Sequence, residues 1–255
     1  GRDAYSKGSI GYELVESLCD VLGEFKKIMD TYQVNDYQAY AASVLRGIKN
    51  EIFILDQIQI RTGLKVHVLS NSEHRFISYK SVAMRQEFEK LIEKGTAVVD
   101  IGGGGLQITV FSKGNVVTTE HLALGTMRMR EQLAGKSRSL AQYELQIEEL
   151  VVKEIEVFRS MYLKDIQIEN LIILGDYIAE IEKHVKKNED KITISVNEFV
   201  KYVEKLSKKN IEQISEELNL PSERDALIIP YIMIFKCMSK SLEAENIWIP
   251  GVNIS

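Results

Sequence analysis

Residues 98–111 have the sequence Val98-Val99-Asp100-Ile101-Gly102-Gly103-Gly104-Gly105-Leu106-Gln107-Ile108-Thr109-Val110-Phe111. Its apolar, largely β-branched ends predict two strands, and the glycine run between them predicts a hairpin turn. Glycines in a turn can take positive φ and let a ligand approach the main chain closely. Consecutive N–H groups can bind an anion, and the carboxylate of Asp100 beside them indicates a metal ion or an activated water. The alternative is a hairpin that only turns a tight corner.

Two common nucleotide-binding motifs are excluded by the residues around the glycines. No Gly-Lys-Ser/Thr follows, so the segment is not a Walker loop. A strand follows instead of a helix, and Gln107 stands where a dinucleotide fingerprint has its last glycine. The remaining functional hypothesis is a phosphate clamp between two strands.

The composition predicts a soluble, cytoplasmic protein. The 255 residues suffice for one large domain or two small ones, and the net charge of −5 argues against broad nucleic-acid binding. No apolar run approaches the roughly 20 residues of a membrane span. Cys19 and Cys237 are expected to be reduced core residues, and the four histidines lack the spacing of a zinc site.

Helices and strands alternate in the first part of the chain. Strands are expected at residues 36–43 and 64–69, and helices at 10–32, 44–61 and 73–92. This alternation predicts parallel strands joined by crossover helices. A domain boundary is expected at Lys94-Gly95.

The second part begins with three adjacent strands at residues 97–101, 106–111 and 115–121, which predict an antiparallel meander. Further elements are expected to be helices at 125–133 and 140–163, a buried strand at 170–174 and a helix at 223–242. Three helix starts carry capping signals: Asp176, Ser195 with Glu198 as a capping box, and Ser222.

Alternating elements followed by a meander with Asp-Ile-Gly-Gly-Gly resemble the actin-like ATPase superfamily. Within it, the chain is similar to the exopolyphosphatase and guanosine pentaphosphate phosphohydrolase (Ppx/GppA) family. Residues 100–104 match the start of the family's Asp-Ile-Gly-Gly-Gly-Ser-Thr-Glu loop, and residues 41–50 resemble its Ala-Thr-Ser-Ala-Leu-Arg-x-Ala-x-Asn segment. Residues 122–128 resemble Leu-Pro-Leu-Gly-Ala-Val-Arg, and residues 223–230 resemble Glu-Arg-x-x-x-Ile-Pro-Gly.

This resemblance implies an α/β fold with two ribonuclease-H-like (actin-like) domains flanking a cleft. Residues 1–93 would be the latter part of an incomplete first domain, whose phosphate loop would lie before Gly1. Residues 94–255 would form the second domain, which carries the glycine-rich phosphate loop. The implied protein is an exopolyphosphatase-like hydrolase that uses Mg²⁺ and acts on polyphosphate or guanosine pentaphosphate, with a homodimer as one arrangement.

The resemblance also implies roles for individual residues. Asp100 would bind Mg²⁺, and Arg46 would pair with a phosphate, since its planar donors match that anion. Asn50, one helical turn after Arg46 on the same face, would brace it. The backbone amides expected to hold phosphate oxygens are those of Gly102, Gly103, Gly104 and Gly105.

Three places depart from the family pattern. Gln107 stands at the family's glutamate and carries no charge for a metal. The family's general base is the second glutamate of Ser-Gly-x-Glu-Glu-Ala-Arg. The ungapped match places His74 at that position, and a shift of the helix start by one residue places Glu73 there. The alternative is that neither residue acts as the base. At residues 174–178 only Gly175 remains of a Gly-x-x-Gly-Thr loop.

These departures leave two functions open, besides a structural scaffold that retains only the fold. The first is hydrolysis of polyphosphate or guanosine pentaphosphate, with Glu73, His74 and Gln107 as the altered catalytic groups. The second is a catalytically degenerate relative that binds polyphosphate or a guanosine tetra- or pentaphosphate as a sensor.

Overall fold

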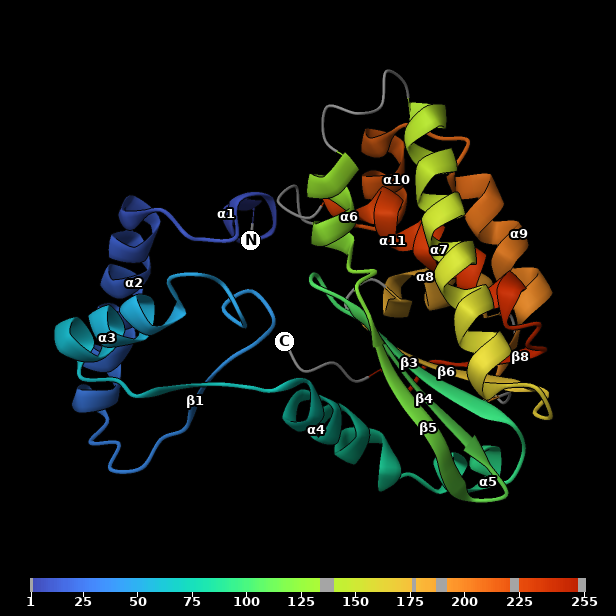
Figure 1. Cartoon of the computed structure of the whole chain (residues 1–255), viewed down its shortest axis with the longest axis horizontal. Coiled ribbons are helices and arrows are strands. Elements are labelled where there is room, and N and C mark those ends of the chain that lie inside the picture. Colours follow the sequence, from blue (N-terminus) through green and yellow to red (C-terminus); the bar gives the residue numbers. More distant parts are fainter. Residues whose placement is uncertain (1, 134–139, 176–177, 187–191, 221–224, 252–255) are drawn as a thin grey trace. The chain divides into compact units, whose positions relative to one another are not determined.

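A computed structural model describes residues 2–133, 140–175, 178–186, 192–220 and 225–251 of the chain. The chain divides into two compact units, Gly1–His74 (unit 1) and Arg75–Ser255 (unit 2) (Figure 1). Among the described residues, no helix combines the length and the apolarity that a membrane span requires.

Unit 1 is built on a pair of short parallel strands, as the alternation predicts. β1 (Ala39–Ala41) pairs in parallel with β2 (Val66–Val68). The core of the unit lies where α2 (Tyr12–Thr31) packs on α3 (Glu51–Thr62), and it includes Val15 and Ile54. The short helix α1 (Arg2–Lys7) precedes α2.

The expected helix over residues 44–61 begins later than predicted. Residues 43–47 form turns, and α3 starts only at Glu51. Gly47 has a φ of 72°, a left-handed conformation that an α-helix does not contain. The periodic apolar residues of α2 identify the helix correctly, but Leu14 and Phe25 are exposed on it, and the buried side chains of α2 are Val15 and Cys19.

Unit 2 is organised around a mixed six-stranded sheet of order β5-β4-β3-β6-β8-β7. β3, β4 and β5 form the predicted antiparallel meander, and β3, β6 and β8 run parallel to one another. The strands are β3 (Thr96–Ile101), β4 (Leu106–Ser112), β5 (Asn115–Leu122), β6 (Asn170–Leu174), β7 (Ile194–Ser195) and β8 (Asn246–Trp248).

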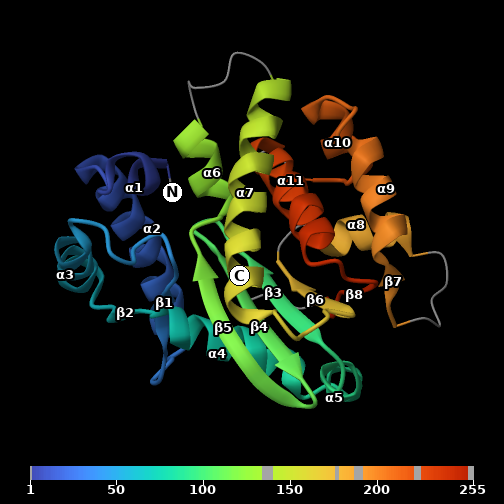
Figure 2. The same cartoon turned by 45° about the vertical axis from the view of Figure 1, so that its right-hand side comes forward.

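One face of this sheet is covered by helices that follow the meander. Figure 2 shows α7 (Leu140–Tyr162) and α11 (Asp225–Ser241) in front of the strands, and alternate residues such as Val99 and Ile108 point to the core beneath them. The remaining helices of the unit that follow the meander are α6 (Thr126–Leu133), α8 (Ile178–Val185), α9 (Val196–Leu206) and α10 (Ile211–Glu217).

The opposite face is covered by α4 (Asn71–Ala83) and α5 (Gln86–Ile92). The Phe111 ring lies against two aromatic rings there, stacked on Tyr79 at 5.7 Å and edge-on to Phe88 at 5.5 Å between ring centroids. The expected single helix over residues 73–92 is therefore wrong, since it breaks after Ala83. Because both helices pack on this sheet, the units divide before the boundary expected at Lys94-Gly95.

The predicted capping signals have different outcomes. Ser195 precedes α9, but its side chain makes no capping hydrogen bond, so the predicted capping box is wrong. Asp176 and Ser222 lie outside the described residues. Cys19 and Cys237 are buried free thiols, as predicted.

We expect Phe111→Ala to lower the free energy of unfolding of unit 2 by about 3–5 kcal/mol, because it removes a buried ring and leaves a cavity. The measurement is urea unfolding followed by the fluorescence of Trp248, the only tryptophan of the chain and a member of the same buried cluster. Val117→Ala, at a side chain that is 44% exposed on β5, is the control and should cost less than about 1 kcal/mol. Equal losses for the two variants would contradict the packing described above.

Candidate functional site

The glycine loop, Gly102–Gly105, connects β3 to β4 and lies against the start of α6. The Gly102 N–H donates to Gly105 O at 3.0 Å and closes the turn. The first residues of α6 then donate to the loop carbonyls: the Thr126 N–H to Gly102 O at 3.1 Å and the Arg128 N–H to Gly103 O at 3.0 Å. Arg128 also donates from Nε to Gly104 O at 2.8 Å.

The carbonyls of Gly102, Gly103 and Gly104 therefore face α6. The Gly102 amide, expected to hold a phosphate oxygen, instead closes the turn, which leaves the later loop amides as the groups able to meet an anion. In the part of the chain that the structure describes, the N–H groups of Gly103 and Gly104 donate to no backbone carbonyl. An anion can accept hydrogen bonds from such amides.

Close packing restricts three glycines, Gly103 and Gly105 of the loop and Gly125 directly before α6. A Cβ on Gly103 would lie 2.9 Å from Met127 Sδ, and a Cβ on Gly125 would lie 2.3 Å from Gly103 O. A Cβ on Gly105 would lie 2.4 Å from His121 Cε1. Gly102, Gly103 and Gly105 do not use the positive φ that glycine permits. The structure instead explains Gly103 and Gly105 by close packing, which the sequence also indicated as an alternative.

Asp100 lies at the carboxyl end of β3, directly before the loop. The Ser78 hydroxyl, from α4, donates to Asp100 Oδ2 at 2.8 Å, and Ser78 is itself buried. The two side chains border a small pocket of about 20 Å³, lined by Ser78, Tyr79, Val98, Asp100, Gln107, Thr109 and Leu174. That volume is enough for one water molecule, and five of the lining side chains carry groups able to hydrogen-bond to water.

Strand register places three polar side chains side by side. Asp100 is opposite Gln107 on β4, and Gln107 is opposite His121 on β5. Residues directly opposite each other in antiparallel strands point to the same face, so these three form one row, the polar row. Gln107 in the middle of the row is buried, and His121 at the sheet edge is exposed.

The donor chemistry at Asp100 fits a magnesium ion. Among the described residues, no group of three or more His, Cys, Asp or Glu side chains gathers as a metal site. Mg²⁺ needs no such cage where phosphates are present, because one or two carboxylates, water and phosphate oxygens complete its coordination. A single carboxylate in the polar row meets that requirement.

Arg46 of unit 1 carries a donor without a partner. Its Nε donates to Leu69 O at 2.6 Å, whereas its Nη2 is buried with no hydrogen-bond partner among the described residues. Burial lowers the pKa of the guanidinium, and nearby Tyr5, Glu51 and Glu73 oppose that shift. Arg46 follows β1 and its acceptor follows β2, so the guanidinium lies at the carboxyl ends of the parallel strands, where α/β proteins bind ligands.

The expected pairing of Asn50 with Arg46 on one helix face is wrong, because Arg46 lies in the turn before α3. The Asn50 side chain instead binds the chain before α2. It accepts from the Ile10 N–H at 3.1 Å and donates to Ile10 O at 2.8 Å. A phosphate-binding role for Asn50 stays a prediction.

Glu73 forms the capping box at the start of α4. Its carboxylate accepts from the Ser70 N–H at 2.8 Å, and the Glu73 N–H donates to Ser70 Oγ at 3.1 Å. The carboxylate also lies 2.9 Å from His67 Nε2. The Ser70 hydrogen bonds, followed by the His67 bond, lower the pKa of Glu73 from 4.5 to about 2. His74, the other candidate base, follows Glu73 in the first turns of α4 and is partly buried.

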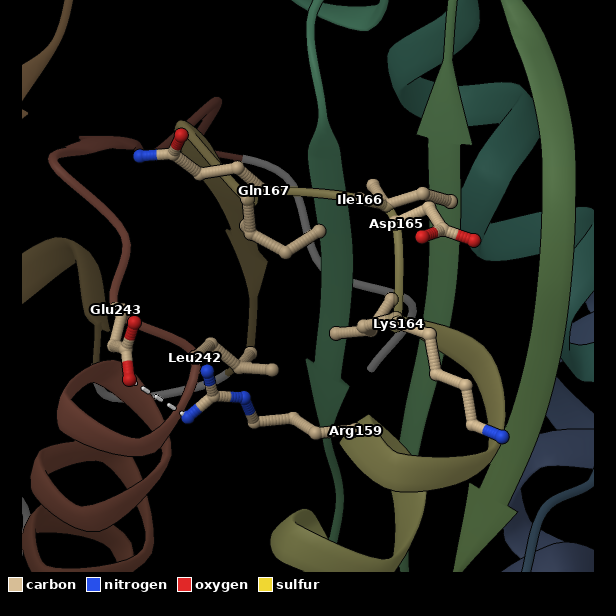
Figure 3. Close-up of a pocket in the computed structure, with 9 residues that line it drawn as sticks. Arg159, Lys164, Asp165, Ile166, Gln167, Leu242 and Glu243 are labelled. Carbon is tan, nitrogen blue, oxygen red and sulfur yellow. Dashed lines mark hydrogen bonds and ion pairs between the residues drawn. The ribbon is translucent and has the colours of Figure 1, made fainter.

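A larger pocket, of about 420 Å³, lies at the opposite end of the sheet (Figure 3). The turn that precedes β6 lines it, so it is at the amino end of a strand whose carboxyl end lies toward Asp100. Arg159 in this pocket is paired with Glu243 at 2.9 Å. Ligands of α/β sheets bind at the carboxyl ends of strands, so the glycine loop is the better candidate.

Comparison with known proteins agrees with this geometry. The model of the Ppx/GppA phosphatase family matches residues 2–253. This chain belongs to the Ppx/GppA phosphatase family. The family identity predicted from residues 41–50 and 100–104 is thereby confirmed.

Solved Ppx/GppA structures share the fold. An exopolyphosphatase from Cytophaga hutchinsonii has a TM-score of 0.74 to this chain at 16% identity, and the match covers 95% of this chain and 80% of that one. The Aquifex aeolicus member of the Ppx/GppA family has a TM-score of 0.71 to this chain at 19% identity. That match covers 97% of this chain and 80% of the Aquifex chain. The predicted α/β fold is confirmed, and it is the fold of these solved Ppx/GppA structures.

A curated relative matches a smaller part. The bifunctional 3-dehydroquinate synthase/phosphatase of Fusobacterium nucleatum is 23% identical over 134 residues, which are 52% of this chain and 20% of that protein. The chain thus matches a fifth of the length of that relative.

Three residues that adjoin the candidate site were not expected from the sequence. Ser78 and His121 adjoin Asp100 and Gly105 only through helix packing and strand register, for which no local signal exists. Arg128 is the last residue of the segment 122–128, which resembles a segment of the family. That resemblance was the one indication in the sequence that Arg128 lies near the loop.

We expect Gly125→Ala to lower the free energy of unfolding of unit 2 by about 1–3 kcal/mol, because the added Cβ would overlap the loop backbone. Gly102→Ala is the matched control: its Cβ would be at an ordinary 3.6 Å from Gly105 O, and its φ is not positive. Urea unfolding monitored by Trp248 fluorescence compares them. Equal stability of the two variants would contradict the packing of the loop on α6.

We expect the carboxyl of Glu73 to titrate near pH 2 in NMR, since Ser70 and His67 stabilise its charged form. A depressed pKa stabilises the fold above the unfolded value, so this contribution is complete above pH 4.5 and is lost as the pH falls toward about 2. Glu73→Gln should remove that part of the pH dependence. A measured pKa close to 4.5 would show that the capping box does not form.

Proposed function

We propose that this chain is a phosphoanhydride hydrolase that releases terminal phosphate from inorganic polyphosphate or guanosine pentaphosphate. The observation that carries the proposal is the glycine loop, whose carbonyls are bound by α6 while the amides of Gly103 and Gly104 remain available. Membership in the Ppx/GppA phosphatase family and the exopolyphosphatase from Cytophaga hutchinsonii with the same fold support this substrate class.

In the proposed reaction the terminal P–O–P bond breaks. The oxygen of a water molecule bonds to the terminal phosphorus, a base takes the water proton, and the rest of the chain leaves with the bonding electrons. Loop amides hold phosphate oxygens, and the buried amide of Gln107 orients the water. Asp100 would hold Mg²⁺, which offsets the charge of the phosphates.

We propose roles for two groups of unit 1 as well, each argued from its own surroundings. The buried Nη2 of Arg46 needs an acceptor, and a phosphate oxygen supplies one. For the base we favour His74 over Glu73, because a carboxylate with a pKa near 2 accepts a proton poorly at neutral pH.

A second candidate function is binding without turnover. Glu73 is held by its capping box, and Gln107 replaces a glutamate of the family motif. A protein with these two changes can keep phosphate affinity and lose the charged groups that assist water attack. It would then act as a sensor of polyphosphate or of a guanosine polyphosphate.

We expect the full chain to release phosphate from polyphosphate in the presence of Mg²⁺, and Asp100→Asn to lower kcat/KM by about 100-fold, the scale of one lost electrostatic contact at a reaction centre. Phosphate release is measured colorimetrically over a range of Mg²⁺ concentrations. Asp165→Asn, in the pocket at the other end of the sheet, is the control with unchanged activity.

Two results would separate the candidates. Equal rates for the wild type and Asp100→Asn would remove the role of Asp100. Calorimetric binding of polyphosphate by a wild type that releases no phosphate would favour the sensor over the enzyme.

A further inference from the structure

The imidazole of His121 occupies the space beside the fourth glycine of the loop. A Cβ on Gly105 would lie 2.4 Å from Cε1 and 2.6 Å from Nε2 of that ring. These distances are too short for a side chain at position 105, where the resembled family motif has serine. The backbone carbonyl of Leu122, at 2.8 Å from the same Cβ position, also restricts residue 105 to glycine, and the absence of a side chain leaves room for the ring.

His121 is also the outer end of the polar row. It is opposite Gln107, which is opposite Asp100, and β5 is the edge strand of the sheet. Neighbouring strands are roughly 4.8 Å apart, so the backbones of His121 and Asp100 are about 10 Å apart across the row. A ligand that extends along the row from Asp100 toward the edge strand is therefore longer than one phosphate group, as linked phosphoryl groups are.

The chemistry of an exposed imidazole suits a phosphate oxygen. A neutral histidine has one N–H donor in either tautomer, so donation to a phosphate does not require the ring to be protonated. A hydrogen bond to a charged acceptor is stronger than one between neutral groups. The ring lies next to loop amides that are available to the same ligand.

We propose that His121 forms a second phosphate subsite, which contacts a phosphoryl group beyond the terminal one. The terminal group binds at the glycine loop near Asp100, and His121 donates to the following part of the chain. The site thereby selects linked phosphates over inorganic orthophosphate. This inference rests on the proposed function, because it assumes that the loop binds phosphate.

The test compares two probes, inorganic tripolyphosphate and orthophosphate, in calorimetric titrations of the full chain with Mg²⁺ present. We expect His121→Ala to weaken tripolyphosphate binding by about tenfold, the effect of one lost hydrogen bond to a charged group. Orthophosphate binding should change less than twofold. His121→Asn keeps an N–H donor and should recover part of the affinity.

A kinetic measurement gives a second readout. His121→Ala should raise KM for polyphosphate and leave kcat nearly unchanged, because the contact is made equally in the ground state and the transition state. The control is His184→Ala, which removes a histidine that stacks on Tyr202 of α9 and leaves the loop intact. Melting temperatures of all variants show that they are folded.

Each remaining outcome overturns the inference. Unchanged tripolyphosphate affinity in His121→Ala, or equal losses for both probes, excludes a separate subsite while the proposed function stands. A wild type that binds neither probe and releases no phosphate removes the proposed function and this inference together.

Discussion

The contact between Gly125 and the glycine loop is the constraint on which the site in unit 2 depends. Three loop atoms lie 2.3 Å from where a Cβ of Gly125 would be, so backbone meets backbone without an intervening side chain. At that separation the first residues of α6 reach the loop carbonyls, and Arg128 adds its side chain to the same contact. The loop is held by hydrogen bonds on one side and keeps amides for a ligand on the other.

The sheet face covered by α4 and α5 is apolar in one row of residues and polar in the next. This difference determines where the polar side chains of the candidate site lie. One row across the strands contains Val98, Ile172 and Trp248, which pack under α4 and α5. The next row on the same face is the polar row, in which the half-buried carboxylate of Asp100 accepts from Ser78. The packing of α4 on the apolar row therefore brings the Ser78 hydroxyl to Asp100. The polar row ends at the exposed side chain of His121 on the edge strand.

The structure gives reasons for each of the two functions considered. A glycine loop with available amides, an adjoining carboxylate and a small polar pocket that fits one water are the parts that hydrolysis of a phosphoanhydride needs. Against catalysis stand the neutral Gln107 and the capping role of Glu73. Within the proposed reaction, His74 is the remaining candidate for the base, because the carboxylate of Glu73 is held by its capping box.

Local signals in the chain were enough for the hairpin, the meander and the buried strand Asn170–Leu174, because alternation, glycine runs and apolar runs act between near neighbours. They were not enough for the turn at Arg46 or for the break after Ala83, where packing overrides helix periodicity. The meeting of His121 with Gly105 and of Ser78 with Asp100 depends on strand register and on where a helix docks. A shift of one residue in register would turn these side chains to the other face, so only the folded chain decides that they meet.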